Sequence, residues 1–238
     1  MNIALIGYGK MGKAIEEIAL QKGHKIVIKI DQDNFDEFTR ENLSQADAAI
    51  EFTNPHSAFE NIKKCIEFGI PVVSGSTGWT DKLDELKVLC QQKNSAFIYA
   101  SNFSIGVNIF FEINKKLASM MDYLPDYNVT LEEIHHTQKK DAPSGTAITL
   151  AEGILEKVER KKKWVNSISS NPDDLVIVSK RIDPAAGTHS IKYTSAIDDI
   201  EIIHTAHNRK GFAAGAVLAA EYIIGKKGFF TMKDVLNI

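Results

Sequence analysis

The chain has 238 residues, of which 44% are hydrophobic and 25% charged, as in an ordinary soluble globular protein. Its formal charge of −3 argues against nucleic acid or a membrane surface as the main partner. No apolar run approaches the roughly 20 residues needed to span a bilayer, and the length suits one large or two modest domains.

The two cysteines, Cys65 and Cys90, stand inside helix-like patterns and form neither a metal-ligand spacing nor a disulfide framework. The chain opens directly on a strand pattern, so we expect no signal peptide. These features predict a protein of the reducing cytoplasm.

The first elements predict a dinucleotide site. Residues 2–6 (N-I-A-L-I) are typical of a buried parallel strand, and the glycine stretch G-Y-G-K-M-G then leads into a helical pattern at 13–21. A second strand at 25–30 ends at Asp31, about 20 residues after the turn. Glycines let a pyrophosphate approach the backbone, and the helix N-terminus favours its charge. The alternative is a glycine turn that only packs a helix on a sheet.

The acid at the end of the second strand bears on the choice of cofactor. Asp31 can accept hydrogen bonds from ribose hydroxyls and repels a 2′-phosphate, which favours NADH. Gln32 brings no compensating charge, but Lys10 and Lys13 leave NADPH as an alternative.

Strands and helices continue to alternate up to residue 103. Strands are expected at 48–52, 71–74 and 96–100, and helices at 57–68 and 80–93. Ligands of a doubly wound sheet lie at the carboxyl ends of its strands, so the polar strand exits are candidates to line the nicotinamide ribose and ring. The same residue types are also common in ordinary turns. Trp79 is interpreted as a packing residue.

The second half of the chain has a different order of predicted elements. A helix is predicted at 107–121, followed by strands at 129–134, 175–182, 190–197 and 199–207. This order favours an α+β unit with an open, largely mixed sheet. The small-residue helix at 211–224 is expected to return to the first domain. We therefore predict an α/β dinucleotide-binding domain of residues 1–103 with 211–238, and a substrate and oligomerisation domain of residues 104–210.

Two charged segments of this half have plainer interpretations. The basic run 160–163 (R-K-K-K) is expected to be a solvated face. His204 and His207 are spaced like metal ligands before Arg209, but no third ligand with a fitting spacing follows. Structural or interface roles are favoured, and no metal site is predicted.

The stretch 132–146 (E-E-I-H-H-T-Q-K-K-D-A-P-S-G-T) concentrates the chemistry. It runs from a strand end to a helix start, where Ser144 is a good N-cap. Ala147 stands where a capping box would need Glu or Gln, so no side chain reaches back. We expect the N–H groups of Gly145 and Thr146 to meet a substrate carboxylate, helped by nearby lysines. The alternative is a capped surface turn with solvated lysines.

With these residues placed, the chain resembles the dihydrodipicolinate reductase family over its whole length. The resemblance is carried by G-Y-G-K-M-G, E-F-T-N-P, G-S-T-G-W, S-N-F-S-I-G-V-N, E-E-I-H-H-T-Q-K-K-D-A-P-S-G-T-A, G-T-H at 187–189, and H-T-A-H-N-R-K-G-F-A-A-G-A-V. The pattern H-H-x-x-K-x-D-A-P-S-G-T is highly specific, whereas the glycine turn alone is not.

The resemblance implies a Rossmann domain joined to a substrate domain whose sheet builds a homotetramer. It implies NADH- or NADPH-dependent reduction of 4-hydroxy-tetrahydrodipicolinate, a cyclic dicarboxylate, to tetrahydrodipicolinate in lysine biosynthesis through diaminopimelate. His135 then looks like the catalytic acid or base, which an ordinary histidine pKa near 6.5 would suit, and Lys139 like a second proton donor. The implied substrate contacts are His136, Ser144, Gly145 and Thr146. The implied cofactor contacts are Gly7, Tyr8, Gly9, Lys10, Met11, Gly12, Asp31, Gly75, Ser76, Thr77, Ala100, Ser101, Asn102 and Phe103.

The sequence departs from the family pattern at Thr137, Gln138 and Thr188, where many members carry a basic residue, a further histidine and a glutamate. Two other classes share part of these features. Another nicotinamide oxidoreductase, such as an amino-acid or imino-acid dehydrogenase, would share the first half without needing H-H-x-x-K and P-S-G-T. A non-catalytic NAD-sensing module would tolerate loss of the histidine and lysine.

Overall fold

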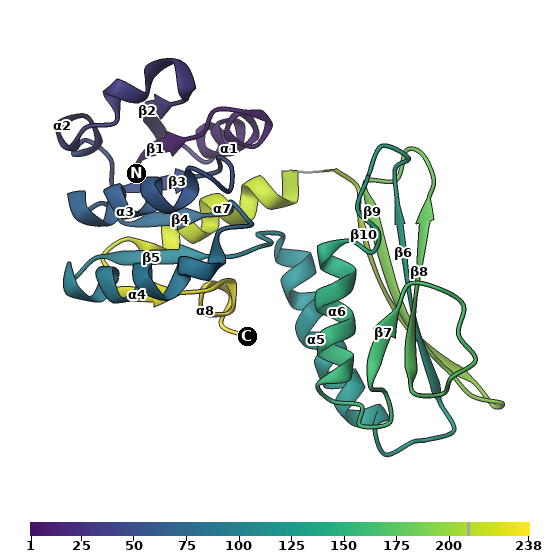
Figure 1. The fold of residues 1–238 in the computed structure, drawn as a ribbon. Coiled ribbons are helices and arrows are strands. Elements are labelled where there is room, and N and C mark those ends of the chain that lie inside the picture. Colours follow the sequence, from purple (N-terminus) through teal and green to yellow (C-terminus); the bar gives the residue numbers. More distant parts are fainter. Residues whose placement is uncertain (209) are drawn as a thin grey trace. The chain divides into compact units, whose positions relative to one another are not determined.

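The computed structural model describes residues 1–208 and 210–238, which form two compact units (Figure 1). The first unit comprises Met1–Ile105 and Lys210–Ile238, and the second comprises residues 106–208. We propose the first as the dinucleotide-binding domain and the second as the substrate domain. Arg209, grouped above with His204 and His207, lies outside the described residues.

The first unit contains a six-stranded sheet in the order β11-β5-β4-β3-β1-β2, and all its neighbouring strands run parallel. The sequence pattern missed one of these strands, the edge strand β11. The strands are β1 (Asn2–Ile6), β2 (Lys25–Ile30), β3 (Ala48–Glu51), β4 (Val72–Ser74), β5 (Ala96–Tyr99) and β11 (Gly228–Phe230).

Helices cover both faces of this sheet, which explains why its strands are apolar without alternation. In β1, Ile3 and Leu5 belong to a core shared with α1 (Lys10–Gln21) and α7 (Lys210–Ile223). Ala4 and Ile6 belong to the opposite core, shared with α3 (Ala58–Phe68) and α4 (Leu83–Gln92). The remaining helices of this unit are η1 (Gln32–Glu37), α2 (Arg40–Leu43), η2 (Thr80–Lys82) and α8 (Met232–Leu236).

Two packing predictions in this unit are explained by close contacts. The small residues of α7 allow a tight approach, since a Cβ added to Gly215 would lie 1.7 Å from the Phe103 carbonyl oxygen. Trp79 is 3% exposed, belongs to the core with α3 and α4, and donates from Nε1 to the Ser76 carbonyl at 2.7 Å. The prediction that Trp79 packs is therefore confirmed.

The second unit contains a five-stranded mixed sheet in the order β10-β9-β6-β8-β7. Strand β6 pairs antiparallel with β9 and parallel with β8, and the predicted open mixed sheet is confirmed. Helices α5 (Ile105–Met121) and α6 (Gly145–Leu155) cover one face (Figure 1). The strands are β6 (Asn128–His135), β7 (Lys163–Val165), β8 (Asp174–Arg181), β9 (Gly187–Thr194) and β10 (Asp199–Ala206).

The basic run 160–163 is not a uniformly solvated face, so that prediction is wrong for its first two residues. Lys161 is 6% exposed, and its Nζ donates to the carbonyl oxygens of Pro172 and Asp174 at 2.7 and 2.9 Å. Arg160 donates to three backbone carbonyls. Except for Asp174, which begins β8, these carbonyls lie at the end of α5 or in loops, where regular structure offers them no donor, and the two side chains supply one.

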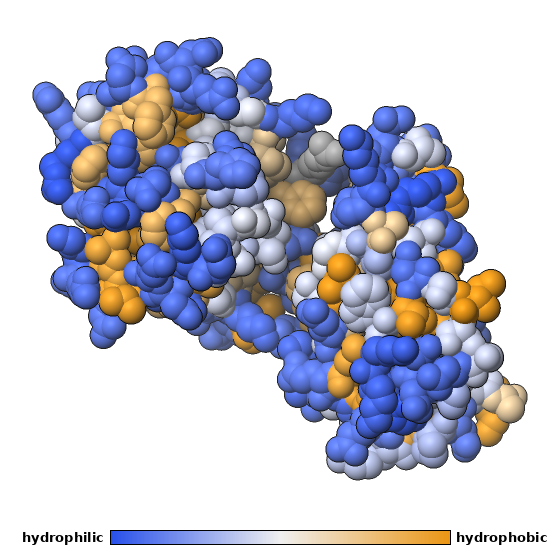
Figure 2. Space-filling view, in the orientation of Figure 1, coloured by the Kyte–Doolittle hydropathy of each residue, from blue (hydrophilic) through white to orange (hydrophobic). Residues whose placement is uncertain are grey.

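Among the helices that the structure describes, none combines the length and apolar character needed to cross a membrane. The visible surface is mostly hydrophilic, with separate apolar patches (Figure 2). On the sheet face of the second unit turned away from α5 and α6, Val178 and Ile203 are 40% and 58% exposed.

Candidate active site

The glycine turn at the carboxyl end of β1 is shaped by close contacts. Gly7 has φ +94°, and a Cβ there would lie 2.1 Å from the Phe52 carbonyl oxygen. A Cβ on Gly12 would lie 2.3 Å from the Gly7 carbonyl oxygen, whereas one on Gly9 would meet no protein atom within 4 Å. Gly7 and Gly12 are thus required by packing, and Gly9 leaves open space where a ligand can reach the backbone.

Helix α1 begins at Lys10, three residues before the predicted start. The glycine pattern predicted a longer turn because glycine disfavours helix interiors, but Gly12 lies inside α1, where its contact with Gly7 tolerates no side chain. Gly9 is the N-cap and forms no side-chain cap, and the first turn carries no acidic residue. Such a helix start presents N–H groups and a positive dipole end to an anion.

Two cavities flank this turn. The β2 pocket, about 410 Å³, is lined by Gly7, Tyr8, Gly9 and Asp31 among others. The β4 pocket, about 430 Å³, contains five further proposed cofactor residues. Those residues are Lys10, Met11, Gly75, Ser76 and Thr77, and Phe52, Thr53 and Asn54 line both pockets.

The segment after β5 lies elsewhere. Ala100, Ser101, Asn102 and Phe103 line neither pocket. Phe103 is buried in the core with α1 and α7, and Asn102 Oδ1 accepts from Ser104 N at 2.9 Å. Because β4 and β5 are parallel neighbours, this segment still follows a strand that ends at the same edge of the sheet.

Charged side chains near Asp31 form a separate arrangement. The Asp31 carboxylate accepts from Gln32 N at 2.9 Å and lines the β2 pocket. Lys29 pairs with Glu16 at 2.7 Å and lies over the Tyr8 ring, 4.6 Å from its centroid. The lysine nearest to Asp31 on this strand is therefore already paired with Glu16.

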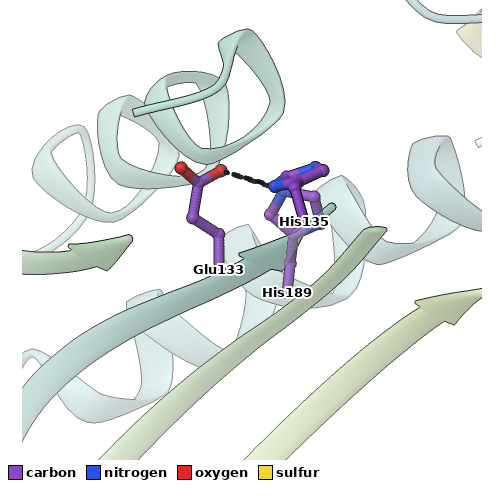
Figure 3. A group of neighbouring side chains, drawn as sticks. All are labelled: Glu133, His135 and His189. Carbon is purple, nitrogen blue, oxygen red and sulfur yellow. Dashed lines mark ion pairs between the residues drawn. The ribbon is translucent and has the colours of Figure 1, made fainter. Parts of the chain in front are cut away.

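In the second unit, strand pairing builds a buried acid–histidine corner (Figure 3). The alternation of β6 puts Glu133 and His135 on its buried face, toward α5 and α6. The register of β6 with β9 puts His189 directly across from Glu133. One Glu133 oxygen lies 3.4 Å from His135 Nδ1 and 3.7 Å from His189 Nε2.

The Glu133 carboxylate is fully buried and strongly hydrogen-bonded. Both of its oxygens accept from Ser144 N, at 3.1 and 3.2 Å, and one also accepts from Ser179 Oγ at 2.7 Å. Burial pushes the pKa of Glu133 upward, but the nearby His189 and the hydrogen bonds from Ser144 and Ser179 outweigh it and hold that pKa well below its usual range. Glu133 is thus an anion in this unit.

His135 is neutral at pH 7 in this environment. Its residue is 7% exposed, and Nδ1 is enclosed without a hydrogen-bond partner. Burial lowers the pKa of His135 to about 4, although the Glu133 carboxylate acts in the opposite direction. This differs from the ordinary value assumed from the sequence, which cannot show the burial.

The start of α6 is joined to this corner. Ser144 is the N-cap as predicted, because its Oγ accepts from Ala147 N at 3.2 Å. Ser144 Oγ also lies 3.2 Å from His189 Nε2. Next to it, a Cβ on Gly145 would meet no atom within 4 Å, so the first turn of α6 is open to a ligand on that side.

The loop between β6 and α6 carries the lysine of the motif. Lys139 Nζ bonds both carboxylate oxygens of Asp141 at 2.9 Å, and its charge contributes to the lowered pKa of His135. Arg181 donates to the Lys139 and Asp141 carbonyls and lies 3.6 Å from Glu133. His136 is half-buried at the start of this loop.

Four residues of this site were not predicted from the sequence, namely Glu133, His189, Ser179 and Arg181. Glu133, His135 and His189 also have the geometry of a cation site, with candidate ligand atoms within 4.8 Å of one another. However, Glu133 is already engaged by Ser144 and Ser179, and the Arg181 guanidinium lies beside it. Such surroundings disfavour a further cation.

His204, by contrast, has a packing role. Its ring lies 5.9 Å from that of Phe110, and a Cβ on Gly106 would lie 2.9 Å from its Nε2. Burial lowers its pKa.

A parallel sheet covered on both faces by helices, with a glycine turn at its carboxyl edge, places the chain in the class of dinucleotide-binding proteins. The family model described as "Dihydrodipicolinate reductase, N-terminus" matches residues 1–103, and that described as "Dihydrodipicolinate reductase, C-terminus" matches residues 106–236. The chain belongs to the dihydrodipicolinate reductase family.

Relatives support this membership over the full length. The chain is 54% identical to the 4-hydroxy-tetrahydrodipicolinate reductase of Christiangramia forsetii, covering 100% of this chain and 98% of the relative. It is 34% identical to the enzyme of the same name from Thermosipho africanus, again over 100% and 98%. A dipicolinate-bound dihydrodipicolinate reductase from Paenisporosarcina sp. TG-14 shares the fold, with a TM-score of 0.81, 24% identity and 97% of each chain covered.

Proposed function

We propose that the protein reduces 4-hydroxy-tetrahydrodipicolinate to tetrahydrodipicolinate with NADH or NADPH, in lysine biosynthesis through diaminopimelate. The observation that carries the proposal is the buried corner of Glu133, His135 and His189, joined through Ser144 to the open start of α6. This corner places a histidine, which can carry a proton, beside a helix N-terminus, which can bind an anion. Reduction of a cyclic dicarboxylate requires both. Membership of the family supports the same reaction.

The residues around the glycine turn fit a dinucleotide. The open space at Gly9 and the uncapped start of α1 suit a pyrophosphate, and Asp31 suits the adenosine ribose. Gly75, Ser76, Thr77 and the segment 100–103 would hold the nicotinamide half. A bound nicotinamide supplies the hydride, and Asp31 makes NADH the preferred form.

The substrate is proposed to bind the second unit. The first turn of α6, with Gly145 and Thr146, would receive one carboxylate, because its N–H groups and dipole favour an anion. Ser144 orients that turn through Glu133, and His136 contributes a further polar contact. Lys139 would exchange its pairing with Asp141 for the anionic substrate.

The proton is proposed to come from His135, with Lys139 as the second donor. A substrate dianion beside His135 favours the imidazolium, and so does Glu133, which raises the pKa of His135 against the burial that lowers it. His135 is thus neutral before the substrate binds, and it takes up a proton when the substrate binds. Lys139 stabilises the negative charge that develops on the substrate ring.

We propose a cytoplasmic homotetramer that acts on small molecules, without nucleic-acid or membrane partners. The free cysteines Cys65 and Cys90 are both buried, which fits a reducing compartment. The sheet face carrying exposed Val178 and Ile203 is the surface through which copies of the chain would associate.

Coupled turnover tests this function. The 4-hydroxy-tetrahydrodipicolinate made by the preceding synthase is supplied with NADH or NADPH, and oxidation of the cofactor is followed by absorbance. We expect His135→Ala and Lys139→Ala to lower kcat on the order of a hundredfold, while NADH binding persists. Lys140→Ala, at the exposed neighbour of Lys139, serves as the matched control. Near-normal turnover of either active-site variant would remove that residue from the mechanism.

A further inference from the structure

A buried carboxylate lies beneath the β4 pocket. Glu51 ends β3 and has no exposed surface. Its Oε2 accepts from Ser74 Oγ at 2.5 Å. Its Oε1 accepts from Ser76 Oγ at 2.8 Å, from Thr53 N at 3.0 Å, and from Thr53 Oγ1. The two oxygens therefore have different neighbours, and only Oε1 contacts residues that line the pockets.

The two hydroxyl groups that contact Oε1 have fixed donor and acceptor roles. A hydroxyl can donate once and accept twice. Thr53 Oγ1 donates to Glu51 and accepts from Ser57 Oγ and Asn61 Nδ2, so its capacity is filled. Ser76 Oγ donates to Glu51 and accepts from Thr53 N at 2.8 Å, which leaves one lone pair.

Two further contacts fix the segment that carries Ser76. The Ser76 carbonyl accepts from the indole of Trp79, which is buried in the core. A Cβ on Gly75 would lie 2.2 Å from the Phe52 ring, so the backbone before Ser76 packs directly on the exit of β3. The remaining lone pair of Ser76 thus belongs to a rigid part of the β4 pocket.

We propose that Glu51 is a positioning residue of the dinucleotide site. Its Oε1 takes the hydroxyl hydrogens of Thr53 and Ser76, so that Ser76 meets the ligand only as a hydrogen-bond acceptor. This rests on the proposed function. The partner is an N–H or O–H group of the nicotinamide half, either the carboxamide or a ribose hydroxyl. A phosphate, which offers only acceptors, is directed instead to the start of α1.

The arrangement holds whether or not Glu51 is ionised. Burial raises the pKa of Glu51, and hydrogen bonds from Ser74, Thr53 and Ser76 act in the opposite direction. A proton carried on Oε2, beside Ser74, would leave Oε1 as the acceptor for Thr53 and Ser76. The acceptor oxygen rather than the charge is therefore the functional feature.

Two substitutions of Glu51 separate these features. Glu51→Met keeps the length of the side chain and removes both acceptors, whereas Glu51→Gln keeps one acceptor oxygen for Oε1 and can donate to Ser74 from the other position. We expect Glu51→Met to raise the NADH dissociation constant about tenfold, measured by fluorescence titration of the full-length protein. Glu51→Gln is expected to stay within about threefold of the wild type.

Matched variants test the two sides of the carboxylate. Ser74→Ala removes the hydrogen bond to Oε2. Because Ser74 lines neither pocket, this variant should leave NADH affinity unchanged. Ser76→Ala removes the proposed acceptor and should weaken NADH roughly fivefold. With 3-acetylpyridine adenine dinucleotide, which lacks the amide N–H, this loss disappears if the carboxamide is the partner and persists if a ribose hydroxyl is.

The kcat at saturating NADH distinguishes positioning from general damage. It should stay within about threefold in Glu51→Met, because the effect falls on cofactor affinity. Wild-type affinity in Glu51→Met, or a loss in Glu51→Gln as large as in Glu51→Met, would overturn the proposal. If Glu51→Met does not fold, wild-type affinity in Ser76→Ala overturns it. Failure of the wild type to bind either dinucleotide would instead overturn the proposed function with it.

Discussion

Acidification should weaken the second unit through one buried histidine. Burial lowers the pKa of His135 to about 4, and an unfolded histidine titrates near 6.5. Between these values the unfolded chain binds more protons than the folded one, so stability falls as the pH falls. From pH 7 to pH 5, the contribution of this histidine amounts to about 2 kcal/mol. Glu133, whose pKa is lowered by its hydrogen bonds, keeps its contribution above about pH 5.

Amide hydrogen exchange measures this loss locally, which avoids treating two units as one transition. Exchange in peptides covering β6 and β9 is compared at both pH values, after correction for the intrinsic rates, with β1 and β3 as internal controls. His135→Gln should lose about 2 kcal/mol less than the wild type over this interval. The pH dependence of stability that remains in His135→Gln is expected to come from His204, because burial also lowers the pKa of that residue. Equal losses in the wild type and the variant would refute the reasoning.

Four further substitutions have distinct expected results. Asp31→Ala should weaken NADH more than NADPH in fluorescence titrations, and equal losses would argue against the ribose contact. Gly9→Ala should keep the melting temperature of the wild type but lose about tenfold in dinucleotide affinity. Gly7→Ala should melt several degrees lower, because its Cβ would lie 2.1 Å from a carbonyl oxygen. A lower melting temperature for Gly9→Ala than for Gly7→Ala would contradict this geometry. Glu133→Ala leaves the Ser144 N–H without its buried partner and should destabilise the second unit by about 1–3 kcal/mol in urea unfolding, against which an unchanged stability would count.

Local patterns were sufficient to predict the main elements of both sheets. In the first unit, apolar runs and glycine stops predicted five of the six strands, because strands buried on both faces leave a strong signal. The edge strand β11, three residues long, left too weak a signal. The start of α1 was missed because the need for Gly12 comes from its contact with Gly7, which propensity does not contain.

The acid–histidine corner was only partly predictable. His135, Lys139 and Ser144 stand in one continuous stretch, so the sequence places them together. His189 is 54 positions beyond His135, and it reaches the corner only through the register of β6 with β9. Register depends on pairing across the sheet, so the motif at 187–189 could be noted but not located. The burial of Lys161 has a similar cause, since its partners are carbonyls that a composition pattern does not show.

The interrupted first unit has a consequence for the order of folding during synthesis. Helix α7 and strand β11 belong to its core and sheet, yet they follow the whole second unit along the chain. While residues 106–208 already have everything that their own core needs, the β1 face carrying Ile3 and Leu5 stays without α7. At roughly 5–20 residues per second, the last 29 residues add only a few seconds to this exposure. A chain truncated there would have a complete second unit, but only α1 would cover the α7 side of the first sheet, which leaves apolar surface open to chaperones or aggregation.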